Sequence, residues 1–354
     1  MTRPTPACLA ILAVFCLTGS AHAVYPPLRN GIPYPGYGPE NLALGGMRSL
    51  GLEDPVCILT NPSGVSGRLG CRLLSAAYGP VISDAEYTDN ASSHSDSWVS
   101  GLGSTSMGMR IEVIESLSLG IGAASSADMP FRTAYYIPEG GDSLQGSMEI
   151  QCNFAEADLG LAWDAADWLV LGGAVGLRVY EQNFHISTEE PDYNIRELGY
   201  GWDEMTFRFG ATVPLKEVTL GASWSSPDDY TPRFLAAGGM VNVLENLTVG
   251  AEMESAVLDE AEVLTERFFC IARPAGNLTL RTGLFHTAYT EWISREGLGF
   301  GCGAGYTIGM FTINAGFSWS PVKGEFDHYG YDGMESYEGG TTIISLGATL
   351  DRLH

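Results

Sequence analysis

The sequence predicts an all-β protein, a transmembrane antiparallel β-barrel of about 14 strands with an irregular N-terminal segment. Three observations lead to this fold class. Apolar residues alternate with small or polar ones over segments of about 9–11 residues, the length that a tilted strand needs to cross a bilayer. Short and long connections alternate between these segments. The first part of the mature chain is rich in Pro and Gly and has no such alternation.

Residues 1–23 have the pattern of a secretory signal peptide. Arg3 supplies a positive charge, residues 7–18 form an apolar core, and Ala21-His22-Ala23 is an A-x-A cleavage site. A short membrane anchor is the alternative, although the core is short for a membrane span. We expect cleavage near Ala23, and after it no run of apolar residues is long enough for a spanning helix.

Residues 24–70 are interpreted as a hatch or plug segment. Its density of Pro and Gly disfavours long helices and central strands. An irregular segment of this kind must be held by the protein around it. Disorder remains the alternative for residues 24–39.

Residues 71–354 are predicted to form the barrel. Each segment has an apolar and a polar face, because strand side chains alternate between the two faces of a sheet. The hairpin of residues 298–319 shows this most clearly, since its second face carries Gly, Ser, Thr and Asn instead of Lys and Glu. The predicted strands are residues 71–79, 106–114, 117–127, 155–164, 168–181, 203–213, 217–225, 233–243, 247–256, 263–273, 278–287, 298–307, 310–319 and 341–351.

The connections predict the orientation in a bacterial outer membrane. Such barrels have short periplasmic turns and longer outer loops. The short set is residues 115–116, 165–167, 214–216, 244–246, 274–277 and 308–309, and the mostly longer set is 80–105, 128–154, 182–202, 226–232, 257–262, 288–297 and 320–340. Their strict alternation places both termini in the periplasm.

Apolar rows are expected to face lipid, with charged residues on the opposite face. The rows run from Met107 to Val113, Leu117 to Ile121, Leu169 to Val179, Met205 to Val213 and Leu247 to Met253. An Arg facing lipid at the midplane would cost about 2–4 kcal/mol. A lumen network is therefore predicted from Arg110, Glu112, Glu156, Asp158, Arg178, Arg208, Glu252, Glu254 and Arg281. These residues either meet a substrate carboxylate or tie the wall to the hatch.

The tryptophans suggest two aromatic belts. Trp163 and Trp168 flank a short turn, and Trp98, Trp202, Trp224, Trp292 and Trp319 are expected at the far strand ends or in the long loops. Belts at the two membrane interfaces give this distribution. Tryptophan at the strand ends of a soluble sheet is the alternative.

Composition excludes several functions. A net charge of −24 argues against nucleic acid as a partner. No cofactor motif is present, because Gly299 to Gly305 has a period of two and no helix pattern follows it. The cysteines match no zinc spacing, and a Cys57–Cys71 disulfide remains open. Acidic residues in the long loops form either a solvated surface or a divalent cation site.

We expect no enzymatic activity. His94 and His185 lie near Ser and acidic residues in segments predicted as long loops. Such proximity arises by chance in loops that are rich in these residues. A membrane-barrel hydrolase that uses these histidines is the remote alternative.

The stretch from Asn41 to Gly64 resembles the start of the FadL/TodX outer-membrane transport family and its PorV/PorQ relatives. That family has a glycine pair, then an acidic residue, then an N-P-A-G sequence. The matching residues here are Gly45, Gly46, Asp54, Asn61, Pro62 and Gly64, with Ser63 in place of Ala. The resemblance covers about 25 residues and leaves the rest of the chain to the strand pattern.

The resemblance implies that the hatch lies in the lumen and that the barrel mediates passive uptake of small hydrophobic molecules such as fatty acids. A barrel of this size has a lumen too wide for its own side chains to fill. Irregular backbone at membrane depth must also be enclosed by protein. The resemblance further implies a lateral exit at a kinked third strand, for which Gly120, Gly122 and Pro130 are candidates. In the PorV branch the barrel instead scaffolds or shuttles exported proteins of a secretion system.

Overall fold

The computed structural model describes residues 36–88, 93–127, 131–139, 142–188, 195–227, 233–258, 261–290, 296–327 and 334–351. The expected signal peptide (residues 1–23) and the start of the hatch (residues 24–35) lie outside these residues. The helices are α3 (Gly38–Ala43), η1 (Pro55–Leu59), η2 (Pro62–Val65) and η3 (Gly67–Leu69). The strands are β1 (Leu74–Thr88), β2 (Ser93–Ile114), β3 (Leu117–Ala127), β4 (Phe131–Glu139), β5 (Asp142–Ala166), β6 (Leu169–Thr188), β7 (Ile195–Pro214), β8 (Val218–Ser225), β9 (Arg233–Leu244), β10 (Leu247–Leu258), β11 (Ala261–Ala275), β12 (Leu278–Thr290), β13 (Glu296–Ile308), β14 (Phe311–Asp327) and β15 (Met334–Leu350).

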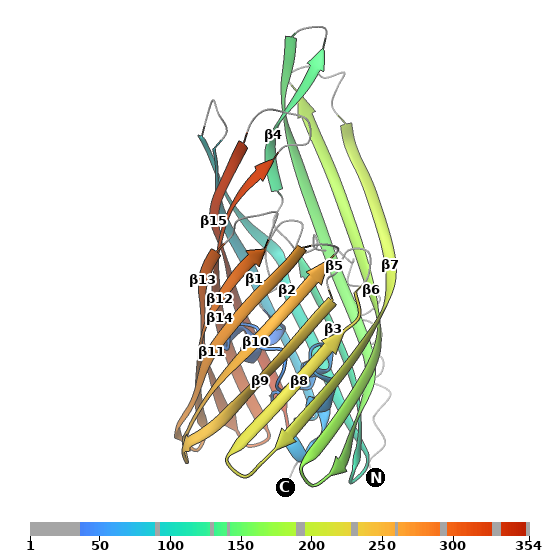
Figure 1. Ribbon diagram of the computed structural model, residues 1–354, viewed down its shortest axis with the longest axis vertical. Coiled ribbons are helices and arrows are strands. Elements are labelled where there is room, and N and C mark those ends of the chain that lie inside the picture. The colour runs from blue at the N-terminus through green and yellow to red at the C-terminus, as the bar shows by residue number, and fades with distance from the viewer. Residues whose placement is uncertain are drawn as a thin grey trace.

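The strands form one antiparallel sheet that closes into a barrel (Figure 1). Closure comes from two pairings, β1 with β15 and β3 with β5. Among the described strands, β4 pairs with β5 alone, so the closed wall contains 14 of the 15 strands. The predicted fold class and strand number are confirmed. Among the described helices, none is long and apolar enough to cross a membrane.

Several strands extend far beyond the predicted ends, and in this respect the predicted long loops were wrong. β2 begins at Ser93 instead of residue 106, and β5 begins at Asp142 instead of residue 155. Trp98, Trp202 and Trp319 accordingly lie within β2, β7 and β14. The strands were predicted from the alternation of apolar and polar residues. A strand that continues above the bilayer does not face lipid, so its sequence need not keep this alternation.

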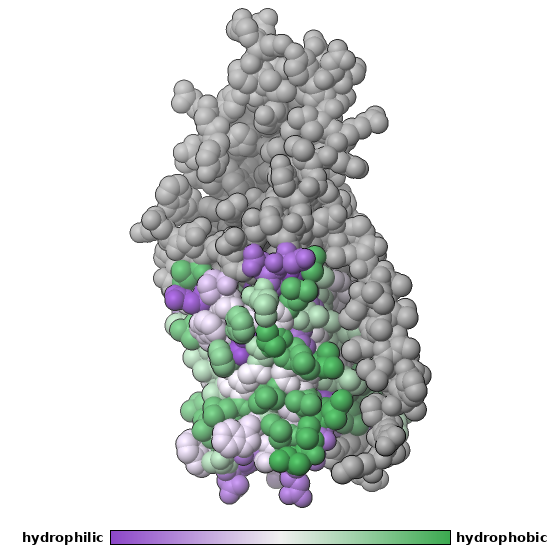
Figure 2. Space-filling view, turned by 90° about the vertical axis from the view of Figure 1, so that its right-hand side faces the viewer, coloured by the Kyte–Doolittle hydropathy of each residue, from purple (hydrophilic) through white to green (hydrophobic). Residues whose placement is uncertain are grey.

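The two faces of the wall differ as the alternation predicts. Large apolar side chains of the predicted rows are exposed on the outside, and examples are Ile111, Leu119, Leu171, Leu177, Met205, Phe207, Phe209 and Met253. On β7, the intervening Thr206, Arg208 and Thr212 are buried. Figure 2 shows hydrophobic residues in a band across one flank, between hydrophilic residues at the lower end and at the upper limit of the coloured surface. The outer surface is therefore suited to lipid.

Residues 36–73, here called the lumenal segment, lie inside the barrel (Figure 1). α3 contacts β12 to β15, β1 and β2, whereas η1 and η2 contact β2, β3 and β5 to β7. Three of its helices carry Pro in the first turn, at Pro39, Pro55 and Pro62. Proline is suited to that position because its missing N–H would have no helical partner there. The Pro-rich sequence thus forms short, separate turns that fill the barrel.

Candidate functional site: the sealed lumen

Two polar residues of the FadL-like motif act as helix caps. Asp54 accepts a hydrogen bond from the Val56 backbone N–H at 2.9 Å and from Ser75 Oγ at 2.5 Å. Asn61 accepts from the Ser63 backbone N–H at 3.1 Å and donates through Nδ2 to the Ser49 carbonyl. Each cap satisfies a backbone group at the start of a 3-10 helix. The motif residues therefore fix the shape of the lumenal segment.

The motif glycines allow the chain to turn and to cross itself. Gly45 and Gly46 have φ values of 79° and 80°, in the left-handed region that favours Gly. Gly64 lies against Gly51, where an added Cβ would be 2.5 Å from the Gly51 Cα and 2.7 Å from Cys57 Sγ. No side chain fits at this crossing.

Gly120 and Gly122, the candidates for weakening the third strand, make room for the lumenal segment. A Cβ at Gly122 would lie 2.4 Å from Ile58 Cγ2, and one at Gly120 would lie 2.8 Å from Ile58 Cδ1. β3 pairs with β5 without a register shift from Leu117 to Ala127. Pro130 lies outside the described residues. The described part of the third strand is thus regular at these two glycines.

A first ion-pair group joins β5, β6 and β7 to the start of the lumenal segment. Arg178 Nε lies 3.0 Å and Arg208 Nη2 lies 2.5 Å from Glu156 Oε2. Arg208 also pairs with Asp158, and Tyr37 donates a hydrogen bond from its hydroxyl to Glu156. The four charged side chains are at most 3% exposed. We call them the β5–β7 group.

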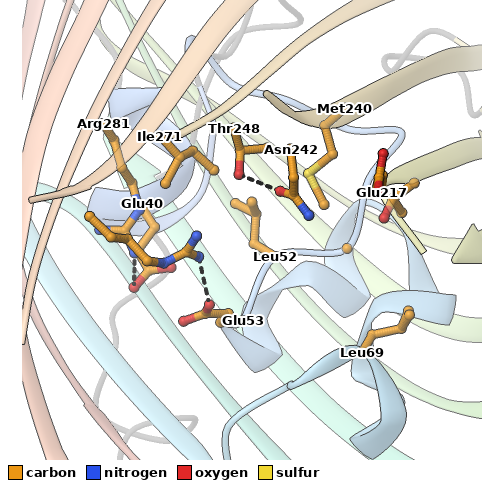
Figure 3. A pocket seen from close by; sticks show the side chains of 13 residues that line it. Glu40, Leu52, Glu53, Leu69, Glu217, Met240, Asn242, Thr248, Ile271 and Arg281 are labelled. Atoms are coloured by element: carbon orange, nitrogen blue, oxygen red, sulfur yellow. Dashed lines mark hydrogen bonds and ion pairs between the residues drawn. The ribbon is translucent and has the colours of Figure 1, made fainter. Parts of the chain in front are cut away.

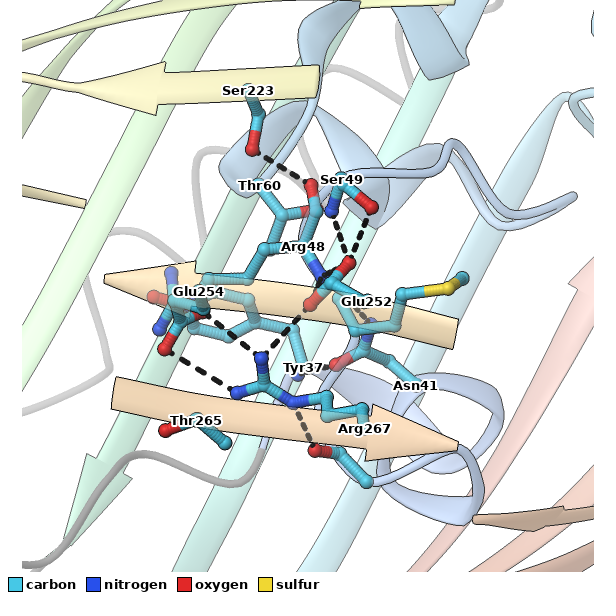
Figure 4. Close-up of polar contacts among 12 residues, drawn as sticks. Tyr37, Asn41, Arg48, Ser49, Thr60, Ser223, Glu252, Glu254, Thr265 and Arg267 are labelled. Carbon is cyan, nitrogen blue, oxygen red and sulfur yellow. Dashed lines mark hydrogen bonds and ion pairs between the residues drawn. The ribbon is translucent and has the colours of Figure 1, made fainter. Parts of the chain in front are cut away.

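A second group binds the lumenal segment to β10 and β11 (Figure 4). Arg267 Nη1 lies 2.8 Å from Glu252 Oε1, and Arg48 Nε lies 2.8 Å from Glu254 Oε2. The backbone N–H of Ser49 donates to Glu252 at 2.6 Å, and Arg267 Nε donates to the Gly45 carbonyl at 2.7 Å. Arg48 therefore binds β10 in two ways. Its side chain pairs with Glu254, and its backbone N–H donates to Glu252. We call Arg48, Glu252, Glu254 and Arg267 the β10–β11 group.

A third group lines a cavity of about 240 Å³ between the lumenal segment and the wall (Figure 3). Arg281 Nη2 lies 3.0 Å from Glu40 Oε1, and Arg273 Nη2 lies 3.2 Å from Glu53 Oε1. Burial raises the pKa of the Glu40 carboxyl, and the neighbouring Arg281 acts against this shift. The apolar part of the lining comes from Leu52, Leu69, Met240 and Ile271.

The predicted lumen residues therefore lie in separate groups instead of one network. Arg110 and Glu112 form a further pair at 3.5 Å on β2, with Glu112 27% exposed. Sequence reasoning missed the partners Tyr37, Glu40, Arg48, Glu53, Arg72, Arg267 and Arg273. Most of these residues lie in the lumenal segment or bind it. This segment has no alternation of apolar and polar residues, so the sequence does not indicate where its side chains point. Arg267 lies on β11, and both faces of this strand carry apolar residues.

The cysteines and histidines add no second site among the described side chains. Cys57 and Cys71 are free thiols buried in one hydrophobic cluster. Among the described residues, no group of three or more His, Cys, Asp or Glu is arranged to hold a metal ion. His94 lies in β2 and His185 lies in β6. Their side chains are not among those that the structure describes.

Comparison with known proteins identifies the fold. No family model and no curated protein matches the chain. Among solved structures, the toluene transporter TodX of Pseudomonas putida matches with a TM-score of 0.66 and 14% identity, over 91% of this chain and 100% of that one. The chain has the FadL/TodX barrel fold. The resemblance inferred from Asn41 to Gly64 is thereby confirmed for the fold.

Two further structures agree. A Pseudomonas aeruginosa FadL homologue matches with a TM-score of 0.66 and 12% identity, over 91% of this chain and 99% of that one. The monoaromatic hydrocarbon channel CymD matches with a TM-score of 0.60 and 11% identity, over 90% of this chain and 99% of that one. At these identities the likeness concerns the fold alone.

Proposed function

We propose that this chain is an outer-membrane channel for the passive uptake of small hydrophobic molecules such as fatty acids or monoaromatic hydrocarbons. In this proposal residues 1–23 are a signal peptide, residues 24–70 a hatch and residues 71–354 the membrane barrel. The bilayer and a small hydrophobic ligand are the partners, and no cofactor takes part. TodX is a toluene transporter and CymD is a monoaromatic hydrocarbon channel, which supports the same substrate class.

The observation that carries the proposal is the sealed lumen. The lumenal segment crosses the barrel. Hydrogen bonds such as Tyr37 to Glu156 hold it to β5–β7 on one side, and buried ion pairs hold it to β10–β12 on the other. A water-filled porin leaves a polar channel open along its axis. A barrel sealed in this way instead suits a solute that leaves the lumen for the bilayer.

The wall has a place for such an exit. Below the level of Ser104 and Ser126, β2 pairs with β3. Above it, among the described residues, Ser93–Gly103 pairs with β1 alone and β4 pairs with β5 alone. β3 ends at Ala127, and β4, which begins at Phe131, pairs with β5 and not with β2 among the described residues. We propose that a hydrophobic solute passes sideways between β2 and β4, above the seal.

No observation favours the alternatives. A secretion scaffold in the PorV manner would need a docking surface for exported proteins, and the described residues indicate none. The hydrolase alternative required a site at His94 or His185. Of the similar structures, TodX is a transporter and CymD is a channel.

Uptake in cells tests this proposal. A Gram-negative host that lacks its own fatty-acid channel would express the chain, and uptake of labelled oleate and toluene would be compared with an empty-vector control. We expect faster uptake of both compounds and no change for labelled glucose, because the seal excludes polar solutes. Unchanged oleate and toluene uptake, or an equal gain for glucose, would contradict the proposed function.

A further inference from the structure

Two buried cysteines lie next to each other where the lumenal segment passes into the wall. Cys57 belongs to η1, and Cys71 lies just before the start of β1. The two residues are 6% and 3% exposed, and they pack into one hydrophobic cluster. Both are thiols in this structure. Neither of them has a part in the proposed uptake function.

Hydrogen bonds hold the two stretches that carry these cysteines side by side. The Arg72 backbone N–H donates to the Glu53 carbonyl at 2.8 Å, and the Cys57 N–H donates to the Asp54 carbonyl at 3.0 Å. The Asp54 side chain also accepts a hydrogen bond from Ser75 Oγ at 2.5 Å. These bonds keep the two thiols next to each other.

Two cysteines of the wall have a different arrangement. Cys270 on β11 and Cys302 on β13 both lie opposite Thr282 of β12, which runs between them. Two strand spacings therefore separate them, a distance of about 10 Å. A disulfide requires Cα atoms that are less than about 7 Å apart. Cys270 and Cys302 thus stay thiols, and they serve as internal controls for the buried pair.

We propose that Cys57 and Cys71 are joined by a disulfide in the mature protein. The proposal rests on the proposed outer-membrane location, because a chain exported there passes through the oxidising periplasm. It does not depend on what the channel carries. The ring that the bond closes contains η2 and η3, and it ties η1 covalently to the start of the wall. Such a ring restricts the unfolded chain and thereby favours the folded state.

The oxidant is a disulfide donor of the periplasm, a thiol–disulfide oxidoreductase in its oxidised form. One cysteine thiolate of the chain attacks a sulfur of the donor, which breaks the donor S–S bond and gives a mixed disulfide. The second cysteine thiolate attacks the chain's own sulfur in this mixed disulfide and releases the donor as a dithiol. The two electrons and the two thiol protons thereby pass to the donor.

The exchange takes place before the barrel closes. In the folded chain both cysteines are buried, so a donor protein does not reach them. The Cys71 thiol beside it, together with burial, raises the pKa of the Cys57 thiol well above its ordinary value, so the folded chain holds little of the reactive thiolate. The unfolded chain in the periplasm has neither restriction. The same burial protects the finished bond from reductants in the folded barrel.

A count of free thiols tests the proposal. Chain isolated from outer membranes is denatured and treated with a maleimide that adds a fixed mass to each thiol, with or without prior reduction. Without residues 1–23 the chain has five cysteines, namely Cys57, Cys71, Cys152, Cys270 and Cys302. We expect three labels before reduction and five after it. Cys57→Ser should give four labels in both samples, and the matched control Cys270→Ser should give two before reduction and four after it.

Five labels on the unreduced wild-type chain would overturn the proposal. A bridge that persists in Cys57→Ser, or that is lost in Cys270→Ser, would also overturn it, because other cysteines would then form the bond. Expression in a host that lacks its periplasmic disulfide donor should raise the unreduced count to five, and an unchanged count of three would contradict the exchange step. Oleate uptake by the same cells reports on the proposed function, so the two proposals can fail independently.

Discussion

The crossing of the lumenal segment with itself depends on single residues. At Gly64 an added methyl group would overlap the backbone of Gly51 and the sulfur of Cys57. Backbone atoms cannot move aside as a flexible side chain can, so relief requires a shift of the whole segment. The N-P-S-G sequence therefore has a steric reason for its last residue.

Gly64→Ala should lower the free energy of unfolding by about 1–3 kcal/mol, as for other over-packed sites. The matched control is Gly276→Ala in the β11–β12 turn, where an added Cβ meets nothing within 4 Å. Urea unfolding in detergent, followed by tryptophan fluorescence, measures both. Equal stability of the two variants would show that the crossing tolerates a side chain.

A cap in the lumenal segment gives a second prediction. Asn61→Ala removes the acceptor for the Ser63 N–H and the donor to the Ser49 carbonyl, and should cost about 1–2 kcal/mol. Asn61→Ser keeps a neutral capping oxygen and loses the amide donor to Ser49, so it should lie between the wild type and the Ala variant. The same urea unfolding curves rank the three proteins. A Ser variant no more stable than the Ala variant would contradict the capping role.

For some residues the sequence does not indicate whether the side chain points into the barrel or away from it. On β7, apolar and polar residues alternate, which predicts Arg208 on the inside, and its side chain is 1% exposed. On β11 both faces are apolar, since Val263, Phe269 and Ile271 are buried and Leu264 and Phe268 are exposed. Glu266 and Arg267 are adjacent, and nothing in their own strand indicates which of them points inward. The structure shows that Arg267 points inward, because it pairs with Glu252 and donates to the Gly45 carbonyl.

At the scale of elements, buried charges hold the strands to one another and to the lumenal segment. Arg208 is 1% exposed and serves two acidic residues on β5. Removing one member of a buried pair leaves an uncompensated charge, which costs far more than the pair itself contributes. The wall should therefore be sensitive to substitutions in the β5–β7 group.

Arg208→Met should destabilise the barrel by about 3–5 kcal/mol, because Glu156 keeps Arg178 but Asp158 loses its partner. The control is Arg68→Met, whose ion pair with Asp167 spans 4.0 Å at the exposed end of the barrel. Exposed pairs contribute little, so this variant should unfold like the wild type. A mild effect of Arg208→Met would show that water reaches the group.

The extent of the strands was predicted well on one side of the barrel and poorly on the other. The short connections were placed correctly, for example Glu115-Ser116 between β2 and β3. The upper ends were missed because β5 and β6 continue well above β8 to β10 (Figure 1). Backbone pairing alone extends them there, and pairing leaves no periodic pattern in the sequence.

At the scale of the whole molecule, the account rests on a barrel whose outside is apolar and whose inside is closed. The number of strands and the direction of the wall followed from alternation alone. The placing of the lumenal segment did not, since its contacts join residues far apart in the sequence, as for Arg48 with Glu254. The FadL-like motif supplied that expectation through resemblance.

Loosening the seal should open an aqueous path. Arg48→Ala combined with Arg267→Ala removes the side chains that join the lumenal segment to β10 and β11. We expect frequent ion-conducting openings in planar bilayers, because the unpaired Glu252 and Glu254 attract water and cations. Phe268→Ala is the control, since this neighbour of Arg267 faces outward. Openings in the control alone, or in neither protein, would contradict the sealing role.

The central claim is most directly tested by the ion conductance of the wild-type chain in a planar bilayer. A lumen closed by buried ion pairs predicts current at the level of the bare bilayer at moderate voltage, even when many copies are inserted. A steady conductance step for each inserted barrel, as an open porin gives, would contradict it.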